Sequence, residues 1–197
     1  MKQIIIATKN KGKAKDFEAI FEPLGFEVLT LFDVAPDMEI EETGSTFEEN
    51  AVLKAETVAN RLHTYVIADD SGLEIDALHG EPGVYSARYA GDHDDEANMD
   101  KALRNLEGVP TEDRTARFTC CLAIAGPDVP TETVKGTCEG VILTERRGDQ
   151  GFGYDPIFYV PEKEKTMAEM TPAEKGSLSH RGNAIRKLAS DLPTWLQ

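Results

Sequence analysis

The sequence predicts an α/β domain built around a mixed β-sheet. Helix-like and strand-like segments alternate over the first third of the chain, which favours parallel strands with helices between them. Two long strand-like segments then follow each other across the turn Gly126-Pro127-Asp128, a pattern typical of an antiparallel hairpin. The 197 residues contain no internal repeat, low-complexity segment or linker, so we expect a single domain over 1–197.

The N-terminal elements follow from short local patterns. Residues 4–7 form an apolar, β-branched run that is typical of a buried strand. A helix is expected over 13–21, ended by Pro23 and Gly25, and a second strand over 26–31.

The next helix is expected to begin at Ser45 or Thr46. A hydroxyl side chain followed by Glu48 and Glu49 resembles a helix N-cap signal. Apolar residues recur at helical spacing as far as Leu62, so this helix should bury one face in the core.

The second half of the chain begins irregularly and then becomes regular. Residues 79–91 are expected to form a loop, whereas acids in the first turn favour a helix over 94–106. The remaining predicted elements are strands at 115–125, 133–144 and 152–160, a helix with Pro172 at its first position, and a last helix over 182–189.

Composition excludes several classes of protein. The formal net charge of −15 argues against a protein that coats nucleic acid or binds an anionic membrane surface. The three cysteines show no CxxC spacing and are expected to be reduced thiols. No apolar run reaches the ~20 residues of a membrane span. We therefore expect a cytoplasmic globular protein.

The charge is unevenly distributed along the chain. The first fifteen residues hold five lysines and no acid, and a second basic cluster comprises Lys175, Arg181, Arg186 and Lys187. Basic patches on an acidic protein can bind a small polyanion while repelling a large one. A solvated surface is the alternative interpretation of the same lysines.

The turn after the first predicted strand is a candidate phosphate site. It consists of Thr8, Lys9, Asn10, Lys11, Gly12 and Lys13. Gly12 would let the backbone turn, and free N–H groups at the start of the following helix favour an anion that Lys13 could reach. The segment is not a Walker A loop, because Ala14 stands where that motif has Ser or Thr. A simple turn with a helix cap is the alternative.

Carboxylates form a second candidate site. A third strand is predicted over 65–68 and ends on Asp69-Asp70-Ser71-Gly72, where open α/β sheets bind ligands. Paired carboxylates suit a divalent cation, and adjacent acids raise the pKa of at least one of them toward that of a useful base. The acids at Glu39, Glu41 and Glu42 could complete a metal site. A turn cap, a solvated acid and a charged loop are the alternatives.

The segment Gly151-Phe152-Gly153-Tyr154-Asp155-Pro156 is a third candidate. Two glycines around Phe152 would expose a flat ring, as a base-stacking platform requires, and Asp155 could accept a ring N–H. A hairpin turn with a core phenylalanine is the alternative. Lys175 and the turn Ser179-His180-Arg181-Gly182 offer further donors, while the four histidines show no zinc-ligand spacing.

Six motifs run in order along nearly the whole chain. They are Ala7-Thr8-Lys9-Asn10 with Gly12-Lys13, Glu41-Glu42-Thr43-Gly44 with Thr46-Phe47 and Glu49-Asn50-Ala51, Ala68-Asp69-Asp70-Ser71-Gly72-Leu73, Pro82-Gly83-Val84-Tyr85-Ser86-Ala87-Arg88-Tyr89, Gly151 to Pro156, and Ser179-His180-Arg181-Gly182. Together they resemble the inosine triphosphate pyrophosphatase family, whose members hydrolyse non-standard purine nucleoside triphosphates. No motif position departs from the family pattern.

The resemblance implies an elongated α/β fold with two lobes around a nucleotide cleft, a homodimer, and Mg²⁺-dependent conversion of ITP, dITP or XTP to the monophosphate and pyrophosphate. It implies that residues 8–13 contact the triphosphate. It also implies that Asp70, with Glu42 or Glu41, serves the metal and that Asp70 activates water. The residues implied to hold the nucleotide are Ser71, Phe152, Gly153, Tyr154, Asp155, Lys175, His180 and Arg181.

The chemistry of these residues agrees with that activity. Attack of water on the α-phosphorus needs a base, a cation and fixed positive groups on the leaving pyrophosphate. Two alternatives stay open: a pyrophosphatase for modified pyrimidine nucleotides with the same architecture, and a nucleotide-binding sensor without turnover. Asp70 and the Glu41-Glu42 pair favour the enzyme, because a sensor needs no base.

Overall fold

The computed structural model describes residues 2–191. They divide into two compact units, of which unit 1 comprises 2–70, 120–136 and 181–191, and unit 2 comprises 71–119 and 137–180. The chain passes from one unit to the other inside three strands and at the start of the last helix. Each unit is therefore built from segments that lie far apart in the sequence.

The strands form a mixed sheet in the order β2-β1-β3-β4-β5-β6-β7. Strand β1 pairs in parallel with β2 and β3, whereas β6 pairs antiparallel with β5 and β7. These pairings confirm the predicted α/β class with a mixed sheet. The strands are β1 (Lys2–Ile6), β2 (Phe26–Thr30), β3 (Val66–Ile75), β4 (Thr115–Gly126), β5 (Val129–Ile142), β6 (Phe158–Val160) and β7 (Lys165–Thr166).

The helices match the predicted ones closely. Thr46 caps the long helix, because its side chain accepts a hydrogen bond from the Glu49 N–H, and Asp94 caps the next helix in the same way. The α-helices of the described residues are α1 (Lys11–Phe21), α2 (Leu31–Val34), α3 (Phe47–Leu62), α4 (Asp95–Asn105), α5 (Pro172–Leu178) and α6 (His180–Ser190). Only the one-turn helix α2 has no counterpart among the predictions, since four residues are too few to show a helical period.

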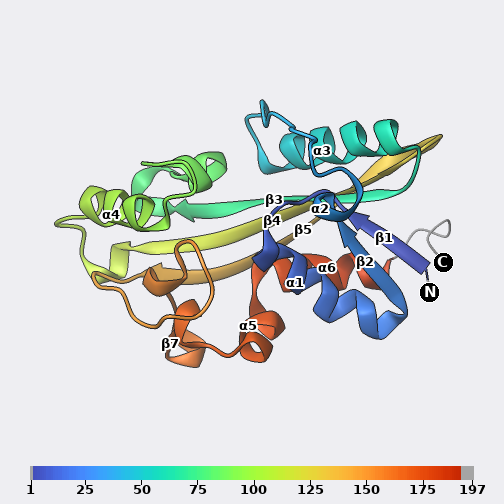
Figure 1. The fold of residues 1–197 in the computed structure, drawn as a ribbon. Helices are drawn as coiled ribbons and strands as arrows, with labels where there is room; N and C mark the ends of the chain where they lie inside the picture. Colours follow the sequence, from blue (N-terminus) through green and yellow to red (C-terminus); the bar gives the residue numbers. More distant parts are fainter. Residues whose placement is uncertain (1, 192–197) are drawn as a thin grey trace. The chain divides into compact units, whose positions relative to one another are not determined.

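In unit 1, α1 and α6 lie on one side of the strands and α3 lies on the other (Figure 1). On the first side, Phe17 of α1 and Ile185 of α6 belong to one buried cluster with Ile67 of β3 and Leu122 of β4. On the other side, α3 buries one face that carries three alanines together with Phe47 and Val58. Because strand side chains alternate between the two faces, the direction of Ile67 also fixes the directions of the residues that follow it in β3.

Unit 2 has its own core around the parts of β3, β4 and β5 that belong to it, residues 71–75, 115–119 and 137–142. Leu73 of β3, Phe118 of β4 and Phe158 of β6 are buried there together with Met99 of α4. The N-terminal end of α4 is also joined to the glycine-rich segment, because the Asp95 carboxylate accepts a hydrogen bond from the Gly153 N–H at 2.9 Å.

Three predicted strands have the wrong bounds. The strand predicted over 133–144 begins earlier, at Val129, and ends at Ile142. Strand β3 does not end before Asp69 but continues to Ile75, because the polar residues at its centre are neutralised within the fold. The strand predicted over 152–160 is confined to β6. The residues before it form turns and a short 3₁₀-helix, since Gly151 and Gly153 both adopt positive φ angles that a strand cannot accommodate.

Candidate active site

The turn between β1 and α1 is organised by its own small polar side chains. Asn10 is the N-cap of α1 and accepts a hydrogen bond from the Lys13 N–H at 3.0 Å. Thr8 in turn accepts one from the Asn10 N–H at 3.0 Å. Gly12 lies inside the helix rather than at a positive-φ turn, so the cap, not the glycine, redirects the chain. The N–H groups of Asn10 and Lys13 are thus engaged within the turn, so an anion at the start of α1 would be bound by the other N–H groups of its first turn.

Asp69 neutralises two basic groups on the α1 and α6 side of the sheet. Its Oδ1 lies 2.6 Å from Lys13 Nζ and its Oδ2 lies 3.3 Å from Arg181 Nε. Asp16 of α1 accepts a second hydrogen bond from the Arg181 guanidinium at 2.8 Å. Burial alone would raise the pKa of Asp69, but Lys13 and Arg181 hold it well below its usual range. Asp69 is therefore a fixed negative charge inside the fold.

Asp70 belongs to the opposite face of β3, toward α3. Lys54 of α3 places its Nζ 2.9 Å from Glu42 Oε1 and 4.0 Å from Asp70 Oδ1. Burial raises the pKa of Asp70 to about 6, the nearby Lys54 opposes this rise and Glu42 adds to it. A carboxylate with this pKa is largely ionised at neutral pH and is still basic enough to take a proton.

The two adjacent acids do not act as the pair that the sequence suggested. Successive side chains of a strand point to opposite faces, so Asp69 and Asp70 meet different partners. The alternative of a solvated Asp70 is also wrong, because only 5% of that residue is exposed.

The loop that carries Glu42 is attached to the first turn of α3. The buried Asn50 side chain accepts a hydrogen bond from the Gly44 N–H at 2.7 Å and donates one to the Gly44 carbonyl at 3.5 Å. A Cβ at position 44 would come within 2.7 Å of both Asn50 Oδ1 and Glu49 Cβ, so only glycine allows this approach. Glu42 is half-buried on this loop, whereas Glu41 is exposed.

Lys54 is the residue of this cluster that the sequence predictions miss. It lies on the buried stripe of α3 and is 8% exposed. Burial alone would lower its pKa, but Asp69, Asp70 and Glu42 raise it above the ordinary value, so the side chain is a cation. A signal exists in the sequence, because Lys54 falls on the face of α3 that also carries Ala51, Ala55 and Val58, and a lysine is almost never fully buried unless it is paired.

In unit 2, the glycine-rich segment forms a compact cluster with α5. The Lys175 ammonium lies 2.6 Å from Asp155 Oδ2 and 4.9 Å from the centre of the Phe152 ring. The same carboxylate oxygen accepts a hydrogen bond from the Phe152 N–H at 3.2 Å. Phe152 is 36% exposed while Asp155 is buried. An accessible ring beside a buried charged pair suits recognition of a flat, polar heterocycle.

The other predicted site residues occupy varied environments. Tyr154 is part of the unit 2 core and donates from its hydroxyl to the Ser86 carbonyl at 2.7 Å. His180 is buried and stacks on Phe118 with ring centres 4.8 Å apart. Ser71 is half-buried. In the β1–α1 turn, Lys9 pairs with Glu39 at 2.9 Å and Lys11 is exposed.

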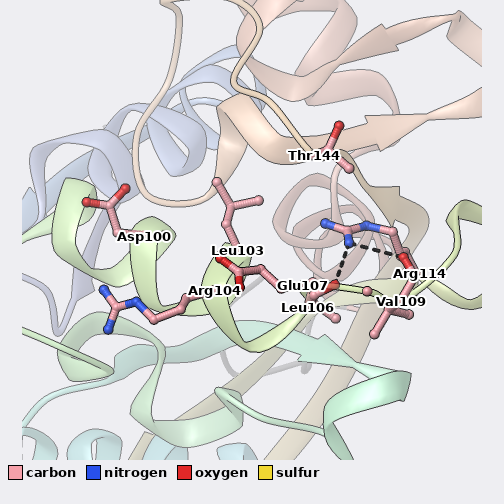
Figure 2. Close-up of a pocket in the computed structure, with 9 residues that line it drawn as sticks. Asp100, Leu103, Arg104, Leu106, Glu107, Val109, Arg114 and Thr144 are labelled. Carbon is pink, nitrogen blue, oxygen red and sulfur yellow. Dashed lines mark hydrogen bonds between the residues drawn. The ribbon is translucent and has the colours of Figure 1, made fainter.

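A separate pocket of about 420 Å³ lies in unit 2 at the C-terminal end of α4 (Figure 2). The buried Arg114 at its wall donates to the main-chain carbonyls of Leu106, Ile142 and Leu143 at 2.8–2.9 Å. Arg114 thus caps α4 and joins it to the end of β5. These contacts give Arg114 a structural role, distinct from the candidate site.

Comparison with known proteins identifies the family. The pattern of the Ham1 family matches residues 4–191. The chain belongs to the Ham1 family. The Ham1 protein of Staphylococcus aureus has the same fold with a TM-score of 0.88 and 52% identity, covering 97% of this chain and 98% of that one. The mixed-sheet α/β fold that the chain shares with this Ham1 protein therefore agrees with the resemblance seen in the motifs.

Named Ham1-family relatives agree with the predicted enzyme class. A protein of Bacillus cereus is 55% identical over 99% of this chain and 97% of its own length, and is named dITP/XTP pyrophosphatase. A protein of Bacillus subtilis with the same name is 57% identical over 96% of each chain. A structure from Mycobacterium abscessus, titled nucleoside-triphosphatase / dITP/XTP pyrophosphatase, has a TM-score of 0.77 and 40% identity, covering 98% of this chain and all of that one.

Two further features of the described residues bear on the predictions. No helix within residues 2–191 is both long and apolar enough to cross a bilayer. Within the same residues, no three His, Cys, Asp or Glu side chains gather into a complete metal site.

Proposed function

We propose that this protein hydrolyses ITP, dITP and XTP to the nucleoside monophosphate and pyrophosphate, and so keeps these nucleotides out of DNA and RNA. The observation that carries the proposal is the buried Asp70 carboxylate, with a pKa of about 6, beside the Glu42–Lys54 ion pair. Attack of water on a phosphate anhydride requires such a base next to cationic groups. The names of the Ham1-family relatives supply the substrate class.

Magnesium is the cofactor in this proposal. Mg²⁺ prefers oxygen ligands and is usually bound by one or two carboxylates together with substrate phosphates. Glu42 and Asp70 offer this donor set on one side of β3, with the exposed Glu41 as the alternative to Glu42. A bound Mg²⁺ would neutralise phosphate charge and stabilise the leaving pyrophosphate.

The residues of unit 1 would perform the hydrolysis. Asp70 accepts a proton from the water that attacks the α-phosphorus, so the new P–O bond forms as the bond to pyrophosphate breaks. The capped start of α1, with Thr8 and Asn10, binds phosphate oxygens through its N–H groups. Lys9, Lys11, Gly12 and Lys13 complete this phosphate-binding turn. Asp69 holds Lys13 at the turn through its 2.6 Å ion pair.

The glycine-rich segment and the start of α6 would recognise the base. Phe152 stacks on the purine, and Asp155 accepts the N1–H that hypoxanthine and xanthine share. His180 or Arg181 donates toward O6. Adenine has an amino group and an N1 acceptor at these positions, so both contacts would be mismatched and its triphosphate rejected. Ser71, Gly153, Tyr154 and Lys175 complete the nucleotide site.

The proposal includes a homodimer that acts in the cytoplasm on free nucleotides, without nucleic acid or membrane as a partner. Light scattering coupled to size exclusion would measure the mass of the particle in solution. A monomer at working concentrations would contradict this part of the proposal and leave the chemistry to be tested separately.

The proposed reaction is tested by its products. ITP and Mg²⁺ should yield IMP and pyrophosphate in equal amounts, with no IDP intermediate. In ¹⁸O water the label should enter IMP, because attack is at the α-phosphorus. Label found only in pyrophosphate would refute this mechanism. Faster turnover of modified pyrimidine nucleotides would favour that alternative, and tight ITP binding without products would favour the sensor.

A further inference from the structure

Lys54 occupies the space between the two proposed metal ligands. Its Nζ is 2.9 Å from Glu42 Oε1 and 4.0 Å from Asp70 Oδ1, and its side chain is 10% exposed. The ammonium therefore supplies a positive charge to both carboxylates from within the fold. Because its stem lies in the buried stripe of α3 beside Ala51 and Ala55, it is anchored close to these acids.

The same arrangement opposes binding of a second cation. A divalent ion held by Glu42 and Asp70 would lie within a few ångströms of the Lys54 ammonium, where like charges repel strongly. The carboxylates would also have to exchange an existing ion pair for the metal. A triphosphate brings negative oxygens that can accept the ammonium, and this removes the conflict.

We propose that Lys54 is the internal counter-ion of the Glu42–Asp70 pair in the free protein, so that Mg²⁺ binds tightly only when a triphosphate can take over the ammonium. This inference rests on the proposed function, since it assigns the order in which that site is filled. The free protein should bind Mg²⁺ weakly, and metal and nucleotide should enter together.

The direct test measures metal affinity without nucleotide. Mn²⁺ binding to the intact protein at pH 8.5, where ordinary carboxylates are ionised, is followed by the loss of the free-ion electron paramagnetic resonance signal. Lys54→Met removes the charge and keeps an unbranched stem, so Mn²⁺ should bind about tenfold tighter or more. Lys54→Arg keeps the charge and should stay within about twofold of the wild type. Equal or weaker binding by the folded Met variant would overturn the proposal.

A matched control separates local repulsion from a general change in net charge. Lys15 of α1 is exposed and lies outside the candidate site. Lys15→Met removes the same charge from the same unit, and Mn²⁺ affinity should stay within about twofold of the wild type. If Lys15→Met and Lys54→Met raised the Mn²⁺ affinity equally, net charge alone would set that affinity, and the proposal would also be overturned.

A second measurement does not depend on the folding of the Met variant. In wild-type protein with ¹³C-labelled lysines, the Lys54 Cε resonance is assigned by its absence from Lys54→Arg. Saturating Mg²⁺ should move this resonance as the ammonium leaves Glu42, and binding that leaves it unmoved would contradict the proposal. Neither experiment contains a nucleotide, so failure of ITP hydrolysis would refute the proposed function without altering the metal result.

Discussion

Asp69 and Asp70 are neighbours in β3, yet their carboxylates serve opposite faces of the sheet. Asp69 pairs with Lys13 and Arg181, and Asp70 faces Lys54. The pKa of Asp69 is lowered by its partners, while burial raises that of Asp70 to about 6. One acid therefore stabilises the fold in its charged form, and the other is a base maintained at a cost in stability.

The two acids should respond oppositely to the same substitution. Asp70→Asn removes a buried charge whose pKa is raised, so at pH 7–8 the free energy of unfolding should rise, by at most about 2–3 kcal/mol. Because the pKa is raised, the gain should shrink as the pH falls from about 6 and vanish below the unfolded-state pKa of about 4, where the carboxyl is protonated in both states. Urea unfolding across this pH range measures the effect.

Asp69→Asn is the matched partner of that variant. It leaves Lys13 and Arg181 without their shared buried carboxylate, so stability at pH 7 should fall by about 3–5 kcal/mol. Because the pKa of Asp69 is lowered, this loss should be complete above the unfolded-state pKa of about 4 and decline at lower pH. Equal effects of the two substitutions would contradict the assignment of opposite roles.

Asp70→Asn should lower the activity although it raises the stability of the protein. The more stable Asp70→Asn variant should lose about 10²–10⁴-fold in kcat at saturating Mg²⁺, because Asn cannot take a proton from water. Glu42→Gln and Glu41→Gln form the control pair on the adjacent loop. Glu42→Gln should weaken Mg²⁺ binding, so that more Mg²⁺ is needed to reach half of the maximal kcat/KM. Glu41→Gln should leave this Mg²⁺ concentration unchanged, since Glu42 contacts Lys54 and Glu41 is exposed. A near-normal kcat in Asp70→Asn would show that another residue is the base.

The buried thiols predict a loss of stability at alkaline pH. Burial raises the pKa of Cys138 and that of Cys121 to about 11 each. A raised pKa means that the folded state favours the neutral thiol, so this contribution is complete below the unfolded-state pKa of about 8.5 and is lost as pH rises through about 11. Between pH 8 and 11, each thiol should lower the free energy of unfolding by about 2–3 kcal/mol. Cys138→Ala should flatten the pH dependence of urea unfolding relative to wild type, and an unchanged slope would refute this.

Local signals in the sequence predicted the helices well, but long-range charge pairing lay beyond them. Thr46 and Glu49 are three residues apart, so their cap is visible as a pattern. Arg181 and Asp69 are separated by 112 positions in the sequence, and no local pattern shows that their side chains meet. The polar run at Asp69 looks like the end of a strand for that reason. Once Lys13, Lys54 and Arg181 neutralise it, the strand continues.

The glycine-rich segment shows the same limit at the candidate site. Its two glycines and Phe152 indicate an exposed ring, and the ring is indeed accessible. The expectation that Asp155 accepts from a ligand rests on the residue type alone. The Lys175 ammonium that holds one oxygen of this carboxylate comes from α5, twenty positions later. A sequence pattern gives the groups available, whereas the fold decides which of their atoms are already engaged.

The last prediction concerns the Asp155–Lys175 pair and its control of base selectivity. Gly151 adopts φ +76°, and a Cβ there would overlap Asp155 Oδ2 and crowd the Lys175 ammonium. Gly151→Ala should therefore separate the pair and turn Asp155 away from the base. Gly108 adopts φ +80° in the same unit with open space around it, so Gly108→Ala carries similar backbone strain, about 1–2 kcal/mol, without this collision.

The assay is kcat/KM for ITP, XTP and ATP in both alanine variants and in Phe152→Ala. Gly151→Ala should narrow the ratio of ITP to ATP by about tenfold or more, because the group that accepts N1–H is displaced. Phe152→Ala should lower all three values in similar proportion, since stacking of about 1–3 kcal/mol is available to every purine. Gly108→Ala should keep the wild-type ratio, because it introduces similar backbone strain without displacing Asp155. An unchanged ratio in Gly151→Ala would place base selectivity outside the Asp155–Lys175 pair.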